Sequence, residues 1–65
     1  MIDIGSRVIV IKDHRKIPLG TIGKVFWKKR YDYHYGTFGL IRIGIRTDSG
    51  ETYFIDAHDT KEIGV

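Results

Sequence analysis

Basic and aromatic side chains are interleaved in the first half of this chain. Residues 7–30 contain eight Lys or Arg and one acidic residue, whereas residues 48–65 contain five acidic residues and one Lys. Trp27 precedes and Tyr31 follows a Lys-Lys-Arg run. Cations neutralise phosphates and flat rings accept stacked bases, so this composition favours nucleic acid as a partner. The simpler interpretation is a solvated charged surface that keeps a small protein in solution.

Catalytic chemistry has little support in the sequence. Cysteine is absent, and the two serines, Ser6 and Ser49, are accounted for as turn residues. Nucleophilic catalysis needs a nucleophile beside an oriented base, and a chain this small offers no interior cavity for one. Asp56, His58 and Asp59 are the closest set of metal-ligand types, but they fall in one tight turn and need not converge. We therefore expect no enzyme activity, no cofactor and no metal.

Two arginines stand four residues apart in the clearest strand pattern of the chain. Ile41, Ile43 and Ile45 alternate with Arg42, Gly44 and Arg46, which places the isoleucines in the core and the arginines outside. The glycine is expected to leave a flat gap between two guanidinium groups that suit phosphate. Cross-strand pairing with Glu51 or another acid is the alternative.

Apolar periodicity and turn residues divide the chain into five short strands. The expected strands cover residues 7–12, 21–28, 40–47, 52–56 and 61–65, with a tight helical turn over 57–60. The first strand should place Val8 and Val10 inward, with Ile9 and Ile11 covered by another element. Asp48-Ser49-Gly50-Glu51 predicts a hairpin turn. The last strand should place Ile63 and Val65 inward.

Two loops carry most of the charge and aromatic area. The first, over residues 13–19, is basic and contains Pro18, which excludes a helix through it. The second, over residues 29–39, is a long loop or two strand extensions that protrude from the body. Its aromatic side chains either bind a ligand or pack down as a lid on a small core.

The glycines and valines of the first half resemble a known motif. Gly5-x-x-Val8-x-Val10 followed by Gly20-x-x-Gly23-x-Val25 resembles the KOW motif of small Src-homology-3-like barrels in ribosomal proteins and transcription elongation factors. The resemblance covers about the first half of the chain. It implies five strands with a short helical turn before the last, and RNA, DNA or their protein machinery as partners. We therefore predict an all-β fold in which residues 1–65 form a single five-stranded Src-homology-3-like barrel.

The predicted function is non-catalytic binding of nucleic acid, RNA or DNA, with low sequence specificity. No base-reading pattern is present, and the sequence leaves open whether the ligand is single-stranded or duplex. The residues expected to contact phosphates are Lys12, Arg15, Lys16, Lys28, Lys29, Arg30, Arg42 and Arg46, and those expected to stack on bases are Trp27, Tyr31, Tyr33 and Tyr35.

A protein-interaction adapter on the transcription or translation machinery is the alternative function. Peptide-binding barrels line a groove with aromatics, here Trp27, Tyr31, Tyr33, Tyr35 and Tyr53. Asp32 is the only acid within the aromatic loop, which disfavours a groove for basic peptides. No apolar run approaches membrane-spanning length, and the lack of cysteine fits a reducing compartment, so we expect a cytoplasmic protein without membrane contact.

Overall fold

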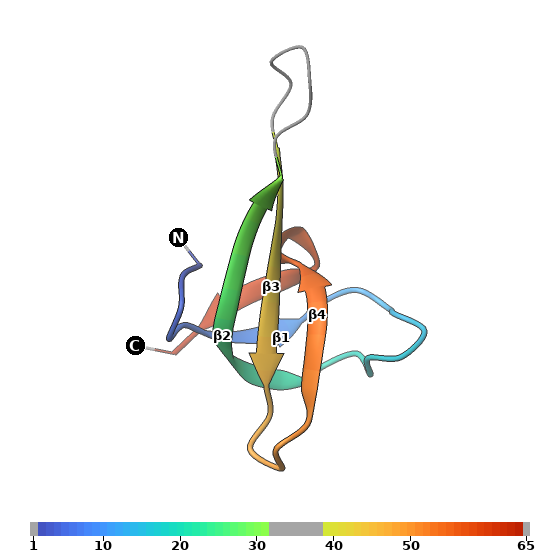
Figure 1. Cartoon of the computed structure of the whole chain (residues 1–65). Helices are drawn as coiled ribbons and strands as arrows, with labels where there is room; N and C mark the ends of the chain where they lie inside the picture. Colours follow the sequence, from blue (N-terminus) through green and yellow to red (C-terminus); the bar gives the residue numbers. More distant parts are fainter. Residues whose placement is uncertain (1, 32–38, 65) are drawn as a thin grey trace.

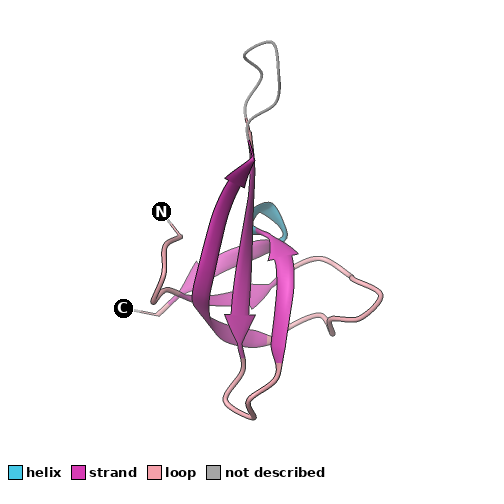
Figure 2. Cartoon of the chain, in the orientation of Figure 1, coloured by secondary structure: helices cyan, strands magenta, loops and turns pink. Residues whose placement is uncertain are grey.

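The chain folds into one curled antiparallel sheet. The computed structural model describes residues 2–31 and 39–64 (Figure 1). Its elements in chain order are β1 (Arg7–Val10), β2 (Ile22–Tyr31), β3 (Leu40–Arg46), β4 (Thr52–Asp56), the 3-10 turn η2 (Ala57–Asp59) and β5 (Thr60–Ile63). Figure 2 shows the strands and, beside the end of β4, this short helical turn. No helix in the described ranges is long and apolar enough to span a membrane. The predicted all-β fold with a helical turn before the last strand is confirmed.

The core lies between the two halves of the curled sheet. The strand order is β4-β3-β2-β1-β5, and β1 and β5 cross behind β2, β3 and β4 (Figure 1). Ile43 and Ile45 are 0% exposed, as their alternation along β3 predicts. The buried apolar residues are Val8, Val10, Ile17, Val25, Ile43, Ile45 and Ile55.

The sheet curls without closing into a hydrogen-bonded barrel. Within the described ranges β4 pairs only with β3, and β5 pairs only with β1. The turn η2 contacts β3 and carries the chain from β4 across to the far side, where β5 joins β1. The remaining side of the core receives Ile17 from the first loop, which is 5% exposed. The five strands and the helical turn therefore follow one another along the chain as expected, but the predicted closed barrel is wrong, because β4 and β5 do not pair with each other within the described ranges.

Several strand bounds differ from those expected. β1 ends at Val10 because the next amide, that of Ile11, donates to the carbonyl oxygen of Asp59, and Ile11 is 47% exposed, not covered as expected. β2 runs on to Tyr31, so residues 29–31 form a strand extension, which is one of the two alternatives expected for the segment 29–39. β5 spans Thr60–Ile63, with Ile63 half-buried, and Val65 lies outside the described residues. The turn at 48–51 is confirmed, with Gly50 at a φ of 90°.

Gly23 marks a corner at which β2 passes close to β3. A Cβ atom at this position would lie 3.1 Å from both the backbone oxygen of Arg46 and the Cβ of Ile45. Both are closer than ordinary van der Waals contact, so only glycine lets the strands approach this far. The crowded bend that the sequence predicts at Gly23 is confirmed.

Candidate nucleic-acid interface

A β-bulge places two successive aromatic residues on the same face of the sheet. The register of β2 against β3 pairs Val25 with Ile45 but Trp27 with Gly44, so one extra residue of β2, Phe26, is accommodated between them. In a regular strand neighbouring side chains point to opposite faces. The bulge breaks this alternation, and both rings lie over β3 on the side away from the core.

Phe26, Trp27 and Phe54 form a cluster that we call the aromatic patch. The ring of Phe54 stands edge-on to Trp27 at a centroid distance of 5.4 Å and to Phe26 at 6.0 Å. Such edge-to-face pairs contribute about 0.5–1.5 kcal/mol beyond the burial of their area. Phe54 is 53% exposed and Phe26 is 37% exposed, so the patch presents ring surface to solvent.

Gly44 lies directly beneath the rings of the aromatic patch. It lies opposite Trp27 on one side and Phe54 on the other. A Cβ atom here would lie 2.9 Å from Cζ of Phe26 and 3.0 Å from Cε1 of Phe54. The flat gap that the sequence predicts between two arginines is therefore wrong, because two phenylalanine rings fill it, while phosphate contact by the arginines themselves stays a prediction.

Cations surround the aromatic patch on the same face. The guanidinium carbon of Arg46 lies 5.1 Å from the ring centroid of Phe26, and Lys24 stands opposite Arg46 on the neighbouring strand. At the other end of β2 the ammonium group of Lys29 lies 5.1 Å from the ring centroid of Tyr31. Cation–π contacts of this kind hold the charges beside the rings without neutralising them.

Arg42 pairs with an acidic residue across the strands, which is the alternative that the sequence analysis gave for it. Its Nε lies 3.7 Å from Oδ1 of Asp56, which is its direct neighbour on β4. Both side chains are partly exposed, so this ion pair contributes little to stability. It does lower the net positive charge on this side of the aromatic patch.

Lys28 is placed differently from the role predicted for it. It pairs with Ile43, a core residue, and therefore alternates onto the inner face of the sheet. Its ammonium group donates to the carbonyl oxygen of Ile2 at 3.0 Å and lies 3.8 Å from Oδ1 of Asp3. Lys28 thus ties the N-terminal segment to β2 and is not presented with the aromatic patch.

The predicted cations of the first loop lie apart from the aromatic patch. This loop projects from the body of the molecule (Figure 1) and carries the exposed Arg15 and Lys16. The carboxylate of Asp59 contacts the beginning of this loop. It lies 2.9 Å from Nε2 of His14 and 3.8 Å from the ammonium group of Lys12. Loop and sheet face are therefore two separate basic surfaces.

The turn residues considered as metal ligands are occupied by other partners. Asp56 contacts Arg42, and Asp59 contacts His14. In residues 2–31 and 39–64, no three carboxylate or imidazole side chains converge as a metal site needs.

Arg30, another of the predicted residues, is not gathered at the aromatic patch. Arg30 pairs with Ile41, which places it on the face opposite to Trp27. Tyr33 and Tyr35 lie outside the described residues. Tyr53, which the alternative function assigns to a peptide groove, packs against the core on the inner side of β4.

Tyr53 serves the turn between β3 and β4. Its hydroxyl donates to Oε2 of Glu51 at 2.6 Å, and the hydroxyl of Ser49 donates to Oε1 at 3.2 Å. These hydrogen bonds, that of Tyr53 above all, lower the pKa of Glu51, while the same contact raises the pKa of Tyr53.

Phe26, Phe54 and Lys24 are part of this face although the sequence did not single them out as site residues. Phe54 had a readable signal, because Ile55 is apolar and inward, so an aromatic residue beside it must face solvent. Phe26 had the same signal, because Val25 beside it is buried, whereas the place of Trp27 on this face depends on the bulge. Lys24 gains its place from its register opposite Arg46.

Comparison with protein-family models, with curated proteins and with solved structures gives no match for this chain. Any function must therefore be argued from the geometry of the sheet face itself.

Proposed function

We propose that this chain is a non-catalytic nucleic-acid-binding module that binds through the outer face of β2, β3 and β4. The observation that carries the proposal is the aromatic patch, whose exposed rings lie between cations on one sheet face. Bases stack on the rings, while lysine and arginine contact phosphates.

The exposure of the aromatic patch supports a ligand. Phe54 keeps about half of its surface in water although two other aromatic side chains touch it. A phenylalanine has no polar atom to satisfy at the surface, so clustered exposure of this kind is typical of a contact surface. A ring that served only the core would turn inward, as Tyr53 does on the same strand.

The charges around the rings favour nucleic acid over a peptide. Lys24, Lys29 and Arg46 lie on this face. Asp56, an acidic residue of the same face, forms an ion pair with Arg42. Stacking and phosphate contacts carry no base code, so we expect low sequence specificity.

Trp27 offers a direct reporter of binding, since it is the only tryptophan of the chain and belongs to the aromatic patch. Its emission should be quenched when single-stranded DNA or RNA is added, and the effect should weaken steeply with salt. Unchanged emission together with no change in anisotropy of labelled DNA and RNA would contradict the proposal.

A matched pair of variants locates the contact. Phe54→Ala should weaken binding by about 5- to 150-fold, which corresponds to the loss of one stacked base. Leu19→Ala removes a similarly exposed apolar side chain, 59% exposed, from the first loop and should leave affinity unchanged. Equal affinities of the two variants would place the ligand elsewhere.

A further inference from the structure

Three cations stand side by side across β1, β2 and β3. Arg7 pairs with Lys24, and Lys24 pairs with Arg46, so the register sets them in one line that we call the cation row. Like charges on directly opposite residues repel each other and destabilise a sheet. In the part of the chain that the structure describes, none of the three forms an ion pair with a carboxylate.

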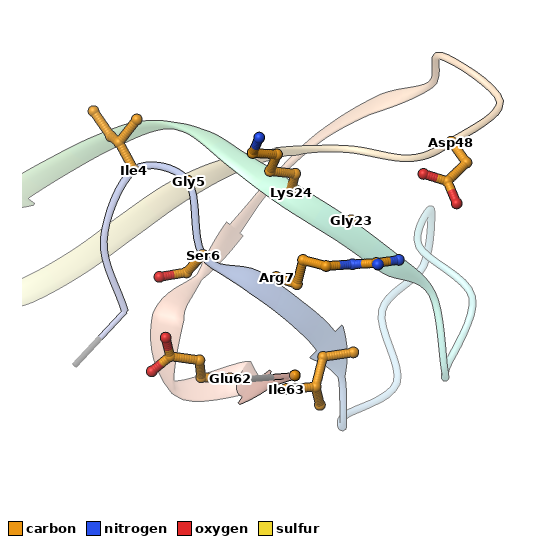
Figure 3. Close-up of a pocket in the computed structure, with 10 residues that line it drawn as sticks. Ile4, Gly5, Ser6, Arg7, Gly23, Lys24, Asp48, Glu62 and Ile63 are labelled. Carbon is orange, nitrogen blue, oxygen red and sulfur yellow. The ribbon is translucent and has the colours of Figure 1, made fainter.

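Two members of the cation row, Arg7 and Lys24, line a groove between the N-terminal segment, β1, β2 and β5. Figure 3 shows Arg7 and Lys24 along this groove, with Asp48 and Glu62 as its two acids. A second groove shares Lys24 and Asp48 with the first and continues to Phe26 and Arg46. The two grooves together connect the aromatic patch to Arg7 over a continuous surface.

The two sides of the aromatic patch differ in charge. The cation row lies on one side of the patch. Its member Arg46 is two residues from Gly44 along β3, which is about 7 Å at the usual rise of a strand. The row on the opposite side of the patch contains Lys29 and Arg42, and there Asp56 compensates one charge. The cation row therefore offers the larger number of cations that form no ion pair within the described residues, although Asp48 and Glu62 lie in the groove beside it.

We propose that the cation row is a phosphate-binding subsite for the backbone of a single-stranded nucleic acid whose bases stack on the aromatic patch. This inference rests on the proposed function and specifies its ligand. Exposed ring faces accept only unpaired bases, because the bases of a duplex are stacked on each other. The bound strand crosses the β-strands' outer face with its phosphates toward Arg7 and its bases toward Phe54.

The test compares two triple variants with the same loss of charge. One replaces Arg7, Lys24 and Arg46 by Gln, and the control replaces Lys12, Arg15 and Lys16 of the first loop by Gln. Binding of labelled dT15 and rU15 is measured at several salt concentrations. Each lost phosphate contact lowers the log-log salt slope by about 0.7, so the row variant should lose about 2 and bind at least tenfold more weakly. The loop variant should keep most of the parent's salt slope and most of its affinity.

Single substitutions keep the inference testable if the triple variant unfolds. Lys24→Gln should lower the slope by about 0.7 while its melting temperature stays equal or rises, because repulsion within the row is relieved. Asp48→Asn removes an acid from the groove and should tighten binding severalfold. Unchanged affinity in Asp48→Asn would place the phosphates outside the groove.

The outcomes separate this inference from the function on which it rests. No binding of any oligonucleotide by the parent protein would overturn the proposed function. Binding by the parent with equal losses in the two triple variants would overturn the cation row alone. Tighter binding of duplex than of single strands would overturn the single-stranded ligand, and equally strong competition by polyglutamate would indicate an acidic protein partner.

Discussion

Gly44→Ala tests whether the aromatic patch is a binding surface or only a cover for the sheet. The added Cβ atom would lie 2.9 Å from Phe26 and 3.0 Å from Phe54, inside the 3.4 Å at which ordinary contact begins. Each ring must therefore move by about half an ångström or rotate away. Both rings are partly exposed, so they have room to move without disturbing the core.

The expected cost of Gly44→Ala to stability is small. Disturbing an edge-to-face ring pair loses about 0.5–1.5 kcal/mol, whereas replacing a glycine restricts the unfolded chain and returns about 0.4–1 kcal/mol. The net change in the free energy of unfolding should stay within about 1 kcal/mol, or about 4–8 °C in melting temperature for a domain of this size. Binding should fall much more, by about tenfold, because the rings no longer share one geometry for stacking.

Gly23→Ala is the matched control. Its Cβ atom would meet the backbone of Arg46 and the Cβ of buried Ile45 at 3.1 Å, and neither can move independently of the sheet. We expect a loss of about 1–3 kcal/mol in stability. Thermal melting by circular dichroism and oligonucleotide anisotropy on the folded fraction report the two effects. Normal binding by Gly44→Ala, or a larger loss of stability there than in Gly23→Ala, would refute this reasoning.

Three further predictions concern the core and the turns. Ile43→Ala removes a side chain that is 0% exposed and should cost about 2–5 kcal/mol, measured by urea denaturation; an unchanged midpoint would contradict its central position. Tyr53→Phe removes the hydrogen bond that lowers the pKa of Glu51. A lowered pKa stabilises the fold above the ordinary value of 4.5, and this stabilisation is lost as the pH falls through the folded-state pKa. The variant should therefore be less stable than the parent at neutral pH, and the difference should shrink as the pH falls below that pKa. Lys28→Gln loses the contact with Ile2 and should lower the melting temperature while binding stays within about twofold, and the reverse pattern would restore Lys28 to the interface.

Local sequence patterns determined the strands and most of the core. The alternation of Ile41, Ile43 and Ile45 specified one inward face because side chains in a strand repeat every two residues. A polar, glycine-containing segment predicted the turn at 48–51, and the charge asymmetry predicted a basic half. These features depend on neighbouring residues only, so they can be read from the chain without knowledge of its partners in space.

Only the tertiary structure decided which side chains of different strands share a face and where the alternation within β2 is interrupted. Phe26 and Trp27 lie together because of a bulge whose position depends on the pairing of β2 with β3. The same shift turned Lys28 inward, although it stands in the most basic run of the sequence. Alternation counts residues along one strand and cannot register an extra residue that the partner strand leaves unpaired.

The proposed binding surface likewise depends on the register between distant segments. Arg7, Lys24 and Arg46 come from three strands, and Phe54 from a fourth, yet antiparallel pairing sets them side by side. The sequence by itself determined that this protein has strands, a small apolar core and an excess of cations beside aromatics. The pairing of the strands, which depends on packing of the whole core, decided where those cations and rings meet.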